Sequence, residues 1–301
     1  MSFSVDAKLE AMNKIPSSPC CRAALLYGML QCSRGFSMLE MSLQTELPGV
    51  ADLYSSLLWK CCRVPTLREE GTYSIVTVSD EWRPRVLKFF SHSQNDISSH
   101  LNRGVFDCDN CQSAYLRGVF LVCGAVSEPL NDYHLELNIP SLPLSRAIGV
   151  LLEELDQPAK FIRRKGDNVL YYKRQDQVED FLTRIGATDS SLAVMTTGMV
   201  KSLSNAENRA RNCDMANLGK TAAASADQRR DVSVIEAHGG LKQLPPELRT
   251  LAELRRDHPI ASLRELGEML EPPLSRAGVC HRFRRIHEIA AEFLEENAKK
   301  D

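Results

Sequence analysis

Two similar stretches of the sequence are the most informative about the fold: CCRAALLYGMLQCSRG at residues 20–35 and NCQSAYLRGVFLVCG at residues 110–124. Each stretch is apolar over about three turns and lacks proline, so each predicts a buried helix. With a shift of 90 positions, Gly28 aligns with Gly118. A glycine costs a helix interior about 1 kcal/mol relative to alanine. Its presence at the same place in both copies predicts that the two helices meet backbone against backbone.

Similar patterns follow the two helices. After the first helix, the sequence predicts strands at 36–44 and 72–78 and helices at 50–61 and 85–90. After the second, it predicts strands at 133–139, 160–164 and 168–173 and helices at 144–155 and 177–185. The last of these helices ends at Gly186, a typical C-terminal stop. The first two thirds of the chain therefore predict two α/β halves that pack about a helix pair.

This duplication resembles the homing endonucleases named after the LAGLIDADG motif. In that family two such helices pack face to face, a curved sheet on either side forms a saddle over DNA, and each helix ends in a carboxylate that holds a divalent metal. Mg²⁺ requires such hard oxygen ligands. Here the corresponding positions lack a carboxylate and hold Gln31, Ser33, Leu121 and Cys123. We therefore expect no catalytic site and no enzyme; the alternative is a metal-dependent DNA endonuclease of the LAGLIDADG type.

The C-terminal part of the chain predicts a helix-turn-helix at about 261–294. A first helix ends before His258 and Pro259, and Ser262 with Glu265 forms a capping-box pattern that opens the second helix. The prolines at 272 and 273 force a break, and Ser275 can cap a third helix that runs to about residue 295. A short helix, a turn and a longer helix are the arrangement that inserts into a major groove.

The third helix has an apolar stripe and a basic face. Four arginines and no acid lie between Leu274 and His287. Arginine can bond guanine bidentately, and arginines at the edge of a recognition helix neutralise phosphates. The candidate DNA-binding residues are Ser275, Arg276, Ala277, Cys280, His281, Arg282, Arg284 and Arg285. The alternative is an amphipathic helix with a solvated basic face.

The segment NRARNCDMANLGKT at 208–221 resembles the signature linker of the WhiA family of bacterial regulators. Further matches lie in the tail, at 262–267 and 278–282, and the resemblance covers nearly the whole chain. It implies a degenerate LAGLIDADG-like domain followed by a helix-turn-helix similar to the promoter-reading region of sigma factors. Cys280 stands where the family commonly has asparagine, which removes a good base-edge reader.

The expected fold class is therefore α+β: a pseudo-twofold duplicated LAGLIDADG-like saddle domain followed by an all-α helix-turn-helix domain. We expect a divergent first repeat at 1–109, a second repeat at 110–203, the signature linker at 204–240 and the DNA-binding domain at 241–301. The resemblance implies a sequence-specific, non-catalytic transcription regulator that binds double-stranded promoter DNA. Its associated roles are cell division, chromosome segregation and, where it exists, sporulation.

Composition agrees with this class. The chain has 301 residues, of which 43% are hydrophobic and 25% charged, which excludes a mainly disordered or fibrous protein. The formal net charge is −2, so only local charge can indicate a nucleic-acid partner. Residues 1–18 lack the apolar core of a signal peptide, and the apolar run at 115–126 is too short to cross a bilayer. We expect a cytoplasmic, nucleoid-associated protein with reduced cysteines and without a membrane partner.

Two further features leave alternatives open. The pair Cys108 and Cys111 could ligate zinc, with His92 and His100 as further ligands. A structural zinc site needs four ligands, and the sequence shows no second cysteine pair with this spacing. Adjacent cysteines such as Cys20 and Cys21 have poor geometry for one tetrahedral ion. We therefore expect no metal and no other cofactor. The basic hairpin at 163–165 either touches DNA phosphates or is a solvated edge. The repeat domain alternatively docks a protein partner without any DNA contact.

Overall fold

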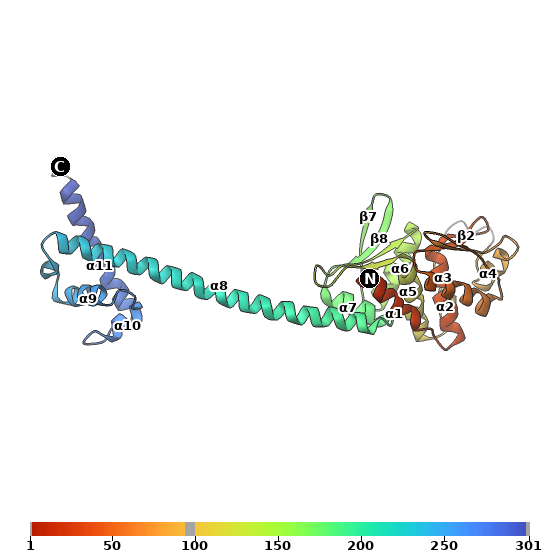
Figure 1. Ribbon diagram of the computed structural model, residues 1–301, viewed down its shortest axis with the longest axis horizontal. Coiled ribbons are helices and arrows are strands. Elements are labelled where there is room, and N and C mark those ends of the chain that lie inside the picture. The colour runs from red at the N-terminus through yellow and green to blue at the C-terminus, as the bar shows by residue number, and fades with distance from the viewer. Residues whose placement is uncertain (1, 94–99, 299–301) are drawn as a thin grey trace. The chain divides into compact units, whose positions relative to one another are not determined.

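The computed structural model describes residues 2–93 and 100–298 of the chain. It divides into two compact units, unit 1 at Met1–Ser202 and unit 2 at Leu203–Asp301 (Figure 1). Unit 1 is α+β and unit 2 is all-helical, in agreement with the expected fold class. Among the described residues, no helix is both long and apolar enough to cross a membrane.

The two halves of unit 1 repeat one topology. The first half contains α2 (Pro19–Cys32), β1 (Arg34–Phe36), β2 (Met41–Thr45), α3 (Pro48–Leu57), a π-helical turn (Leu58–Cys62), β3 (Leu67–Glu70), β4 (Ser74–Thr77) and α4 (Arg83–Phe89). The second half contains α5 (Asp109–Cys123), β5 (Gly124–Val126), β6 (Leu135–Ile139), α6 (Leu142–Glu154), β7 (Lys160–Arg164), β8 (Asp167–Tyr172) and α7 (Gln175–Arg184). The sheets are antiparallel and have the equivalent orders β1-β2-β4-β3 and β5-β6-β8-β7. The duplication expected from the sequence is therefore present.

Helices α2 and α5 pack against each other through their glycines. A Cβ atom on Gly28 would lie 2.2 Å from the carbonyl oxygen of Tyr115, and one on Gly118 would lie 2.2 Å from the carbonyl oxygen of Leu25. No side chain fits at those distances, so the predicted approach of backbone to backbone is confirmed. Most residues of both helices are buried in the core that the two halves share.

Several elements of unit 1 differ from the sequence-based expectation. The run at 36–44 is two strands, β1 and β2, with a turn between them rather than one strand. Strands β3 and β5 and the helix α1 (Phe3–Asn13) were not expected. All four residues of β3 are exposed, so this strand lacks the apolar alternation that marks a half-buried strand. Strand β5 has three residues, which is too short for a periodicity to develop.

The helix α8 (Thr188–Ala237) has 50 residues, begins in unit 1 and ends in unit 2. Its first turn is capped by a side chain from α1. The Glu10 carboxylate accepts hydrogen bonds from the backbone N–H groups of Asp189 (2.6 Å) and Ser190 (2.9 Å). It also accepts from the hydroxyls of Ser190 and Thr188. A carboxylate at this position satisfies unpaired N–H groups and complements the positive end of the helix.

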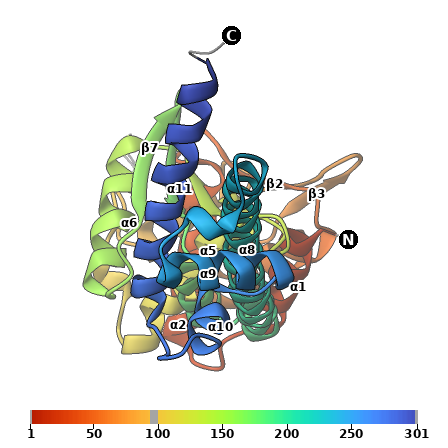
Figure 2. The same cartoon turned by 90° about the vertical axis from the view of Figure 1, so that its left-hand side faces the viewer.

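Unit 2 packs the helices α9 (Pro246–Asp257), α10 (Leu263–Glu268) and α11 (Arg276–Ala298) against the C-terminal turns of α8 (Figure 2). The capping box at the start of α10 is confirmed, since Ser262 accepts from the Glu265 backbone and Glu265 accepts from the Ser262 backbone. The expected stripe on α11 is buried as well, and its residues Val279, Phe283, Ile286 and Ala290 belong to one core.

Candidate nucleic-acid interface

The turn between α10 and α11 is held tightly. The backbone N–H of Leu274 donates to the carbonyl oxygen of Gly267 at 2.9 Å. A Cβ atom on Gly267 would lie 2.3 Å from the Leu274 carbonyl oxygen, so only glycine allows the turn to close onto α10. Leu266 on α10 and Val279 on α11 share the core behind this turn. The first half of α11 is thereby fixed relative to α10, as a helix-turn-helix requires.

A buried arginine connects the parts of unit 2. Arg255 on α9 is only 1% exposed. Its guanidinium donates to the Gln228 side chain on α8 (2.9 Å) and to the carbonyl oxygen of Ala261 before α10 (2.6 Å). It also lies 5.5 Å from the centre of the Phe283 ring on α11. Burial lowers the pKa of Arg255, and the nearby charge of Arg229 lowers it further. The side chain of Arg255 therefore links α9 to three other segments of the unit: α8, the residues before α10, and α11.

The structure brings the predicted DNA-binding residues together at the N-terminal half of α11. Arg282 is half-buried, and the others are exposed: Ser275, Arg276, Ala277, Cys280, His281, Arg284 and Arg285. Ser275 accepts a hydrogen bond from the Gly278 backbone N–H at 3.3 Å, as a capping residue does. Within the described part of the chain, no hydrogen bond or ion pair engages the side chains of Arg276, His281 and Arg284. These three side chains are available to a ligand.

Two of the predicted residues already have an acidic neighbour. Arg285 lies 3.4 Å from a carboxylate oxygen of Glu247 on α9, and Arg282 donates to the Glu247 carbonyl oxygen at 3.3 Å. The Arg282 guanidinium also lies 4.0 Å from the Glu247 carboxylate. These contacts fasten α11 to α9 and partly neutralise both arginines. Arg282 and Arg285 are therefore less free to meet a phosphate than Arg276 and Arg284.

A pocket in unit 2 adds residues that were not among the predicted site residues. It is lined by Asn217, Lys220 and Thr221 of α8 together with Arg264 of α10 and Arg276 of α11, among others. Three of these five side chains are cationic, and Arg264 is paired with Glu268 at 2.9 Å. The sequence signal was the segment at 208–221, which resembles the WhiA signature but was interpreted as a linker. In the structure it is a continuous part of α8 in which every residue is exposed.

The positions that carry carboxylates in the LAGLIDADG endonucleases are turned inward. Gln31 is 2% exposed. Its side-chain amide donates to the Tyr27 hydroxyl (3.0 Å) and the His100 carbonyl oxygen (2.9 Å), and its carbonyl oxygen accepts from the Tyr115 hydroxyl (2.7 Å). All three partners are protein groups, so Gln31 has a packing role. Burial raises the pKa of both tyrosines, which keeps their hydroxyls protonated.

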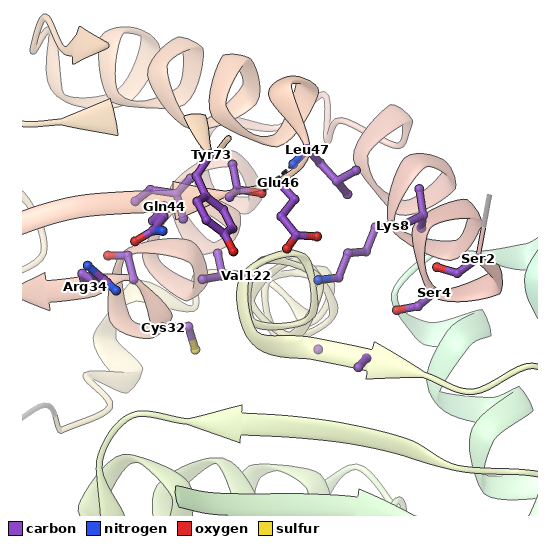
Figure 3. Close-up of a pocket in the computed structure, with 16 residues that line it drawn as sticks. Ser2, Ser4, Lys8, Cys32, Arg34, Gln44, Glu46, Leu47, Tyr73 and Val122 are labelled. Carbon is purple, nitrogen blue, oxygen red and sulfur yellow. Dashed lines mark hydrogen bonds between the residues drawn. The ribbon is translucent and has the colours of Figure 1, made fainter. Parts of the chain in front are cut away.

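The other three positions are similar. Ser33 donates to the Leu30 carbonyl oxygen at 2.7 Å, Cys123 donates to the Val119 carbonyl oxygen at 3.1 Å, and Leu121 is buried. The pocket beside these helix ends has one carboxylate among its described lining residues, Glu46 (Figure 3).

Figure 3 shows Glu46 and the Lys8 ammonium directed toward the same space. Burial lowers the pKa of Lys8, and the charges of Cys123 and Glu46 partly oppose the shift. A single carboxylate next to an ammonium is a poor ligand set for Mg²⁺, which binds through several oxygen atoms.

Four cysteines from the two repeats lie close together. The sequence predicts that no second cysteine pair joins Cys108 and Cys111 as ligands, and this prediction is wrong. The sulfur atoms of Cys20, Cys21, Cys108 and Cys111 all lie within 4.8 Å of one another. The proposed histidine partners lie in a different environment, since His92 contacts the Tyr27 hydroxyl at 2.7 Å and its ring lies 4.9 Å from that of His100. Sequence spacing could not show this convergence, because the two pairs lie almost 90 positions apart.

The outer strands of the two sheets carry opposite charge. Strand β7 reads KFIRR and is exposed along its whole length, and Lys165 follows it in the turn. Its counterpart β3 reads LREE and is equally exposed, but Arg68 is paired there with Asp52 and Glu70. The basic hairpin at 163–165 therefore has no basic equivalent in the first half.

Comparisons with known proteins agree with this architecture. The model of the WhiA LAGLIDADG-like domain matches residues 112–204, and that of the WhiA C-terminal HTH domain matches residues 208–290. Two proteins named probable cell division protein WhiA are each 33% identical to this chain. The match to the protein of Carboxydothermus hydrogenoformans covers 96% of this chain and 97% of the relative. The match to the protein of Alkaliphilus metalliredigens covers 96% of this chain and 98% of the relative. The crystal structure of full-length DUF199/WhiA from Thermatoga maritima shares the fold, with a TM-score of 0.58 at 23% identity, covering 97% of this chain and 99% of that one. The chain therefore belongs to the WhiA family.

Proposed function

We propose that this chain is a non-catalytic, sequence-specific DNA-binding transcription regulator that acts in cell division. The observation that carries the proposal is the exposed basic surface of α11, where Arg276, His281 and Arg284 have no partner among the described residues. The relatives that are 33% identical carry the name probable cell division protein, which supports the cellular role. Chromosome segregation, sporulation and association with the nucleoid belong to the same proposal.

The exposed residues divide into two kinds of contact. Arg284 and His281 lie on the face opposite the buried stripe of α11, where a helix in the major groove meets base edges. Arg276 at the helix start and Lys220 on α8 line one pocket of unit 2, and we assign them to the phosphate backbone beside the recognition helix. The first pair would therefore set the sequence preference, and the second pair would supply affinity that depends on salt. Arg282 and Arg285 contribute less, because Glu247 already pairs with them.

The non-catalytic part of the proposal is supported by the inward-facing residues of unit 1. Gln31 and Ser33 replace carboxylates in the first half, and Leu121 and Cys123 replace them in the second. The alternative is a metal-dependent DNA endonuclease, which would need other carboxylates near the helix ends. A protein partner of unit 1 is a further proposal, since the exposed basic strand β7 could meet either DNA or an acidic protein surface.

The domain boundaries are also proposed. The expected second repeat at 110–203 and the linker at 204–240 are supported by the unit boundary after Ser202 and by the family-model match at 112–204. The proposed first repeat at 1–109 is supported by the equivalent strand order of its sheet. The DNA-binding domain at 241–301 contains the whole helix-turn-helix, although the family model for this region begins earlier, at residue 208.

A gel-shift titration of the full chain on fragmented genomic DNA, with and without Mg²⁺, tests the proposal. We expect a few retained loci, with the DNA uncut in both conditions and one sequence shared by the retained fragments. Arg146 on α6 is exposed and offers a matched control, because Arg146→Ala removes the same charge from unit 1 as Arg284→Ala removes from α11. Cleavage that depends on Mg²⁺ would contradict the non-catalytic role. Equal retention of all fragments would contradict sequence-specific binding.

A further inference from the structure

We propose that Cys20, Cys21, Cys108 and Cys111 bind one zinc ion in a closed tetrathiolate site that fastens the two repeats of unit 1 to each other. The first pair lies in the first turn of α2, Cys108 is the N-cap residue of α5, and Cys111 lies in the first turn of α5. Each repeat thus supplies two ligands. The site lies at the N-terminal ends of the two helices, opposite to the ends that carry metal-binding carboxylates in the endonucleases.

The distances between the sulfur atoms fit one tetrahedral ion. A Zn–S bond of about 2.3 Å places tetrahedral sulfur ligands about 3.8 Å apart. The Cys108 sulfur lies 3.7 Å from that of Cys20, 3.5 Å from that of Cys21 and 3.5 Å from that of Cys111. The sulfurs of Cys21 and Cys111 lie 3.9 Å apart, and the remaining pairs are within 4.8 Å.

Other uses of four cysteines fit less well. A disulfide joins two sulfurs at about 2.05 Å, and none of these thiols is bonded in that way. An iron–sulfur cluster is bound through several iron atoms, so its cysteine ligands surround a larger core than a single ion. A catalytic zinc ion keeps one coordination position open for water, whereas four thiolates close the shell. A structural ion is therefore the function that these distances support.

The electrostatic surroundings favour the anionic complex. Four thiolates and one Zn²⁺ carry a net charge of −2, and the N-terminal ends of α2 and α5 each present a partial positive charge to it. The guanidinium of Arg117 lines the same pocket as Cys21 and adds a full positive charge nearby. Binding converts thiols into thiolates, so the thiol protons pass to solvent when the ion enters. Cys21 and Cys111 are buried while Cys108 is exposed, which leaves the ion an entry path.

Pseudo-twofold symmetry explains why the site forms. The glycine contact holds α2 and α5 together at their middles, and both helices then begin at the same end of the pair. Aligned positions of the two repeats, such as Cys21 and Cys111, meet at that end. The ion would therefore replace a weak contact between two helix ends with four covalently anchored ligands. Zinc binding of this kind contributes directly to folding free energy.

The first test measures the metal content of the full chain, purified under reducing conditions without chelator. We expect one zinc per chain and much less in Cys108→Ser. This variant should still fold, because Cys108 is exposed and occupies an N-cap, where serine is favoured. The matched control is Cys213→Ser, an exposed cysteine on α8 in unit 2, which should retain the full zinc content. Three results would each overturn the proposal: an unsubstituted chain with no more zinc than Cys108→Ser, iron in place of zinc, or a disulfide within the cluster.

A second measurement uses Co²⁺ as a spectroscopic probe. The unsubstituted chain and Cys213→Ser should show thiolate-to-cobalt charge transfer and the strong visible bands of tetrahedral coordination, and Zn²⁺ should displace both signals. Cys108→Ser and Cys111→Ser should lose the intensity of at least one thiolate ligand. Both tryptophans of the chain, Trp59 and Trp82, lie in unit 1, so their fluorescence reports its unfolding. Zinc should raise that unfolding temperature in the control and not in Cys108→Ser; an equal rise in both would overturn the proposal.

Discussion

The two units of this chain place their polar residues in opposite ways. In unit 1 the positions that correspond to metal ligands in LAGLIDADG endonucleases are buried or, at Cys123, half-buried. Gln31 is hydrogen-bonded to Tyr27, Tyr115 and a backbone carbonyl. In unit 2 the basic residues of α11 face outward, and Arg276 and Arg284 have no partner among the described residues. Substitutions at these buried motif positions of unit 1 should therefore change folding stability, whereas substitutions of Arg276 and Arg284 on α11 should change DNA binding.

The largest effect is expected from Gly28→Ala. The new Cβ atom would lie 2.2 Å from the Tyr115 carbonyl oxygen, so α2 and α5 must move apart over their whole contact. We expect the free energy of unfolding of unit 1 to fall by about 3 kcal/mol or more, since overpacking against backbone cannot be relieved by a side-chain rotation. Chemical denaturation followed by the fluorescence of Trp59 and Trp82 measures this change.

The control for this substitution is Gly149→Ala on α6 in the same unit. A Cβ atom there meets only the Leu170 side chain at 3.8 Å, an ordinary contact. Alanine is the better helix former, so the control should leave stability unchanged or raise it by up to about 1 kcal/mol. If both variants destabilised unit 1 equally, the close approach of the two helices would not be the reason for the glycines.

Gln31→Glu should also act on stability. The substitution puts back an acidic residue, but it removes the amide that donates to Tyr27 and to the His100 carbonyl oxygen, and it buries a carboxylate. We expect unit 1 to lose about 2–3 kcal/mol, with no cleavage of DNA in the presence of Mg²⁺. The same fluorescence assay and a plasmid-cleavage assay measure the two outcomes. Cleavage by this variant would mean that the helix ends still form a metal site, which would weaken the comparison between the units.

Arg284→Ala should act on binding and leave folding unchanged. The side chain is exposed on α11 and has no described partner, so its loss should not affect the core of unit 2. For a base contact we expect specific binding to weaken by about 1–3 kcal/mol while non-specific binding changes little. Gel-shift titrations on the selected sequence and on a scrambled one separate these effects. An equal loss on both DNAs would instead assign Arg284 to a phosphate.

Glu10→Gln should cost unit 1 about 1 kcal/mol, the usual contribution of a capping group. Burial alone would raise the pKa of Glu10, but hydrogen bonds from the Asp189 and Ser190 backbone and from the Ser190 and Thr188 hydroxyls lower it overall. A lowered pKa means that the ionised group stabilises the fold above the ordinary pKa of glutamate, and that this contribution disappears as the pH falls through the lowered value.

Thermal unfolding as a function of pH measures this contribution. The difference in stability between the unsubstituted chain and Glu10→Gln should be largest near neutral pH and should shrink in acid. A difference that stays constant with pH would show that the Glu10 charge does not contribute.

The smallest effect is expected from Arg285→Ala. This arginine is exposed but lies 3.4 Å from the Glu247 carboxylate, so its charge is already partly neutralised. We expect a uniform loss of under about 1 kcal/mol on all DNAs and a salt dependence that becomes shallower by less than the ~0.9 of a full phosphate contact. Arg276→Ala is the comparison, because that arginine has no such partner among the residues that the structure describes and should change the slope more. A larger change for Arg285 would place it in the interface in spite of Glu247.

Local features were predicted well from the sequence. The close approach at Gly28 and Gly118 followed from one glycine in each of two similar apolar helices, and the capping box at Ser262 followed from four residues. The signals that failed were too short or too exposed to show a periodicity, as in β3 and β5. The 50-residue helix α8 was not predicted as one element, because its middle is exposed on all sides and carries no amphipathic pattern.

The duplicated helices, the helix-turn-helix and the family can be inferred from the amino-acid sequence, because periodicity, caps and motifs each depend on a few neighbouring residues. Which distant groups meet depends instead on how the helices and strands pack. Cys20 and Cys21 join Cys108 and Cys111 because two helices cross at their glycines and begin at the same end. Glu247 reaches Arg285 because α9 packs on α11. Such contacts depend on how whole helices pack, and the number of residues between two partners in the sequence does not indicate whether they meet.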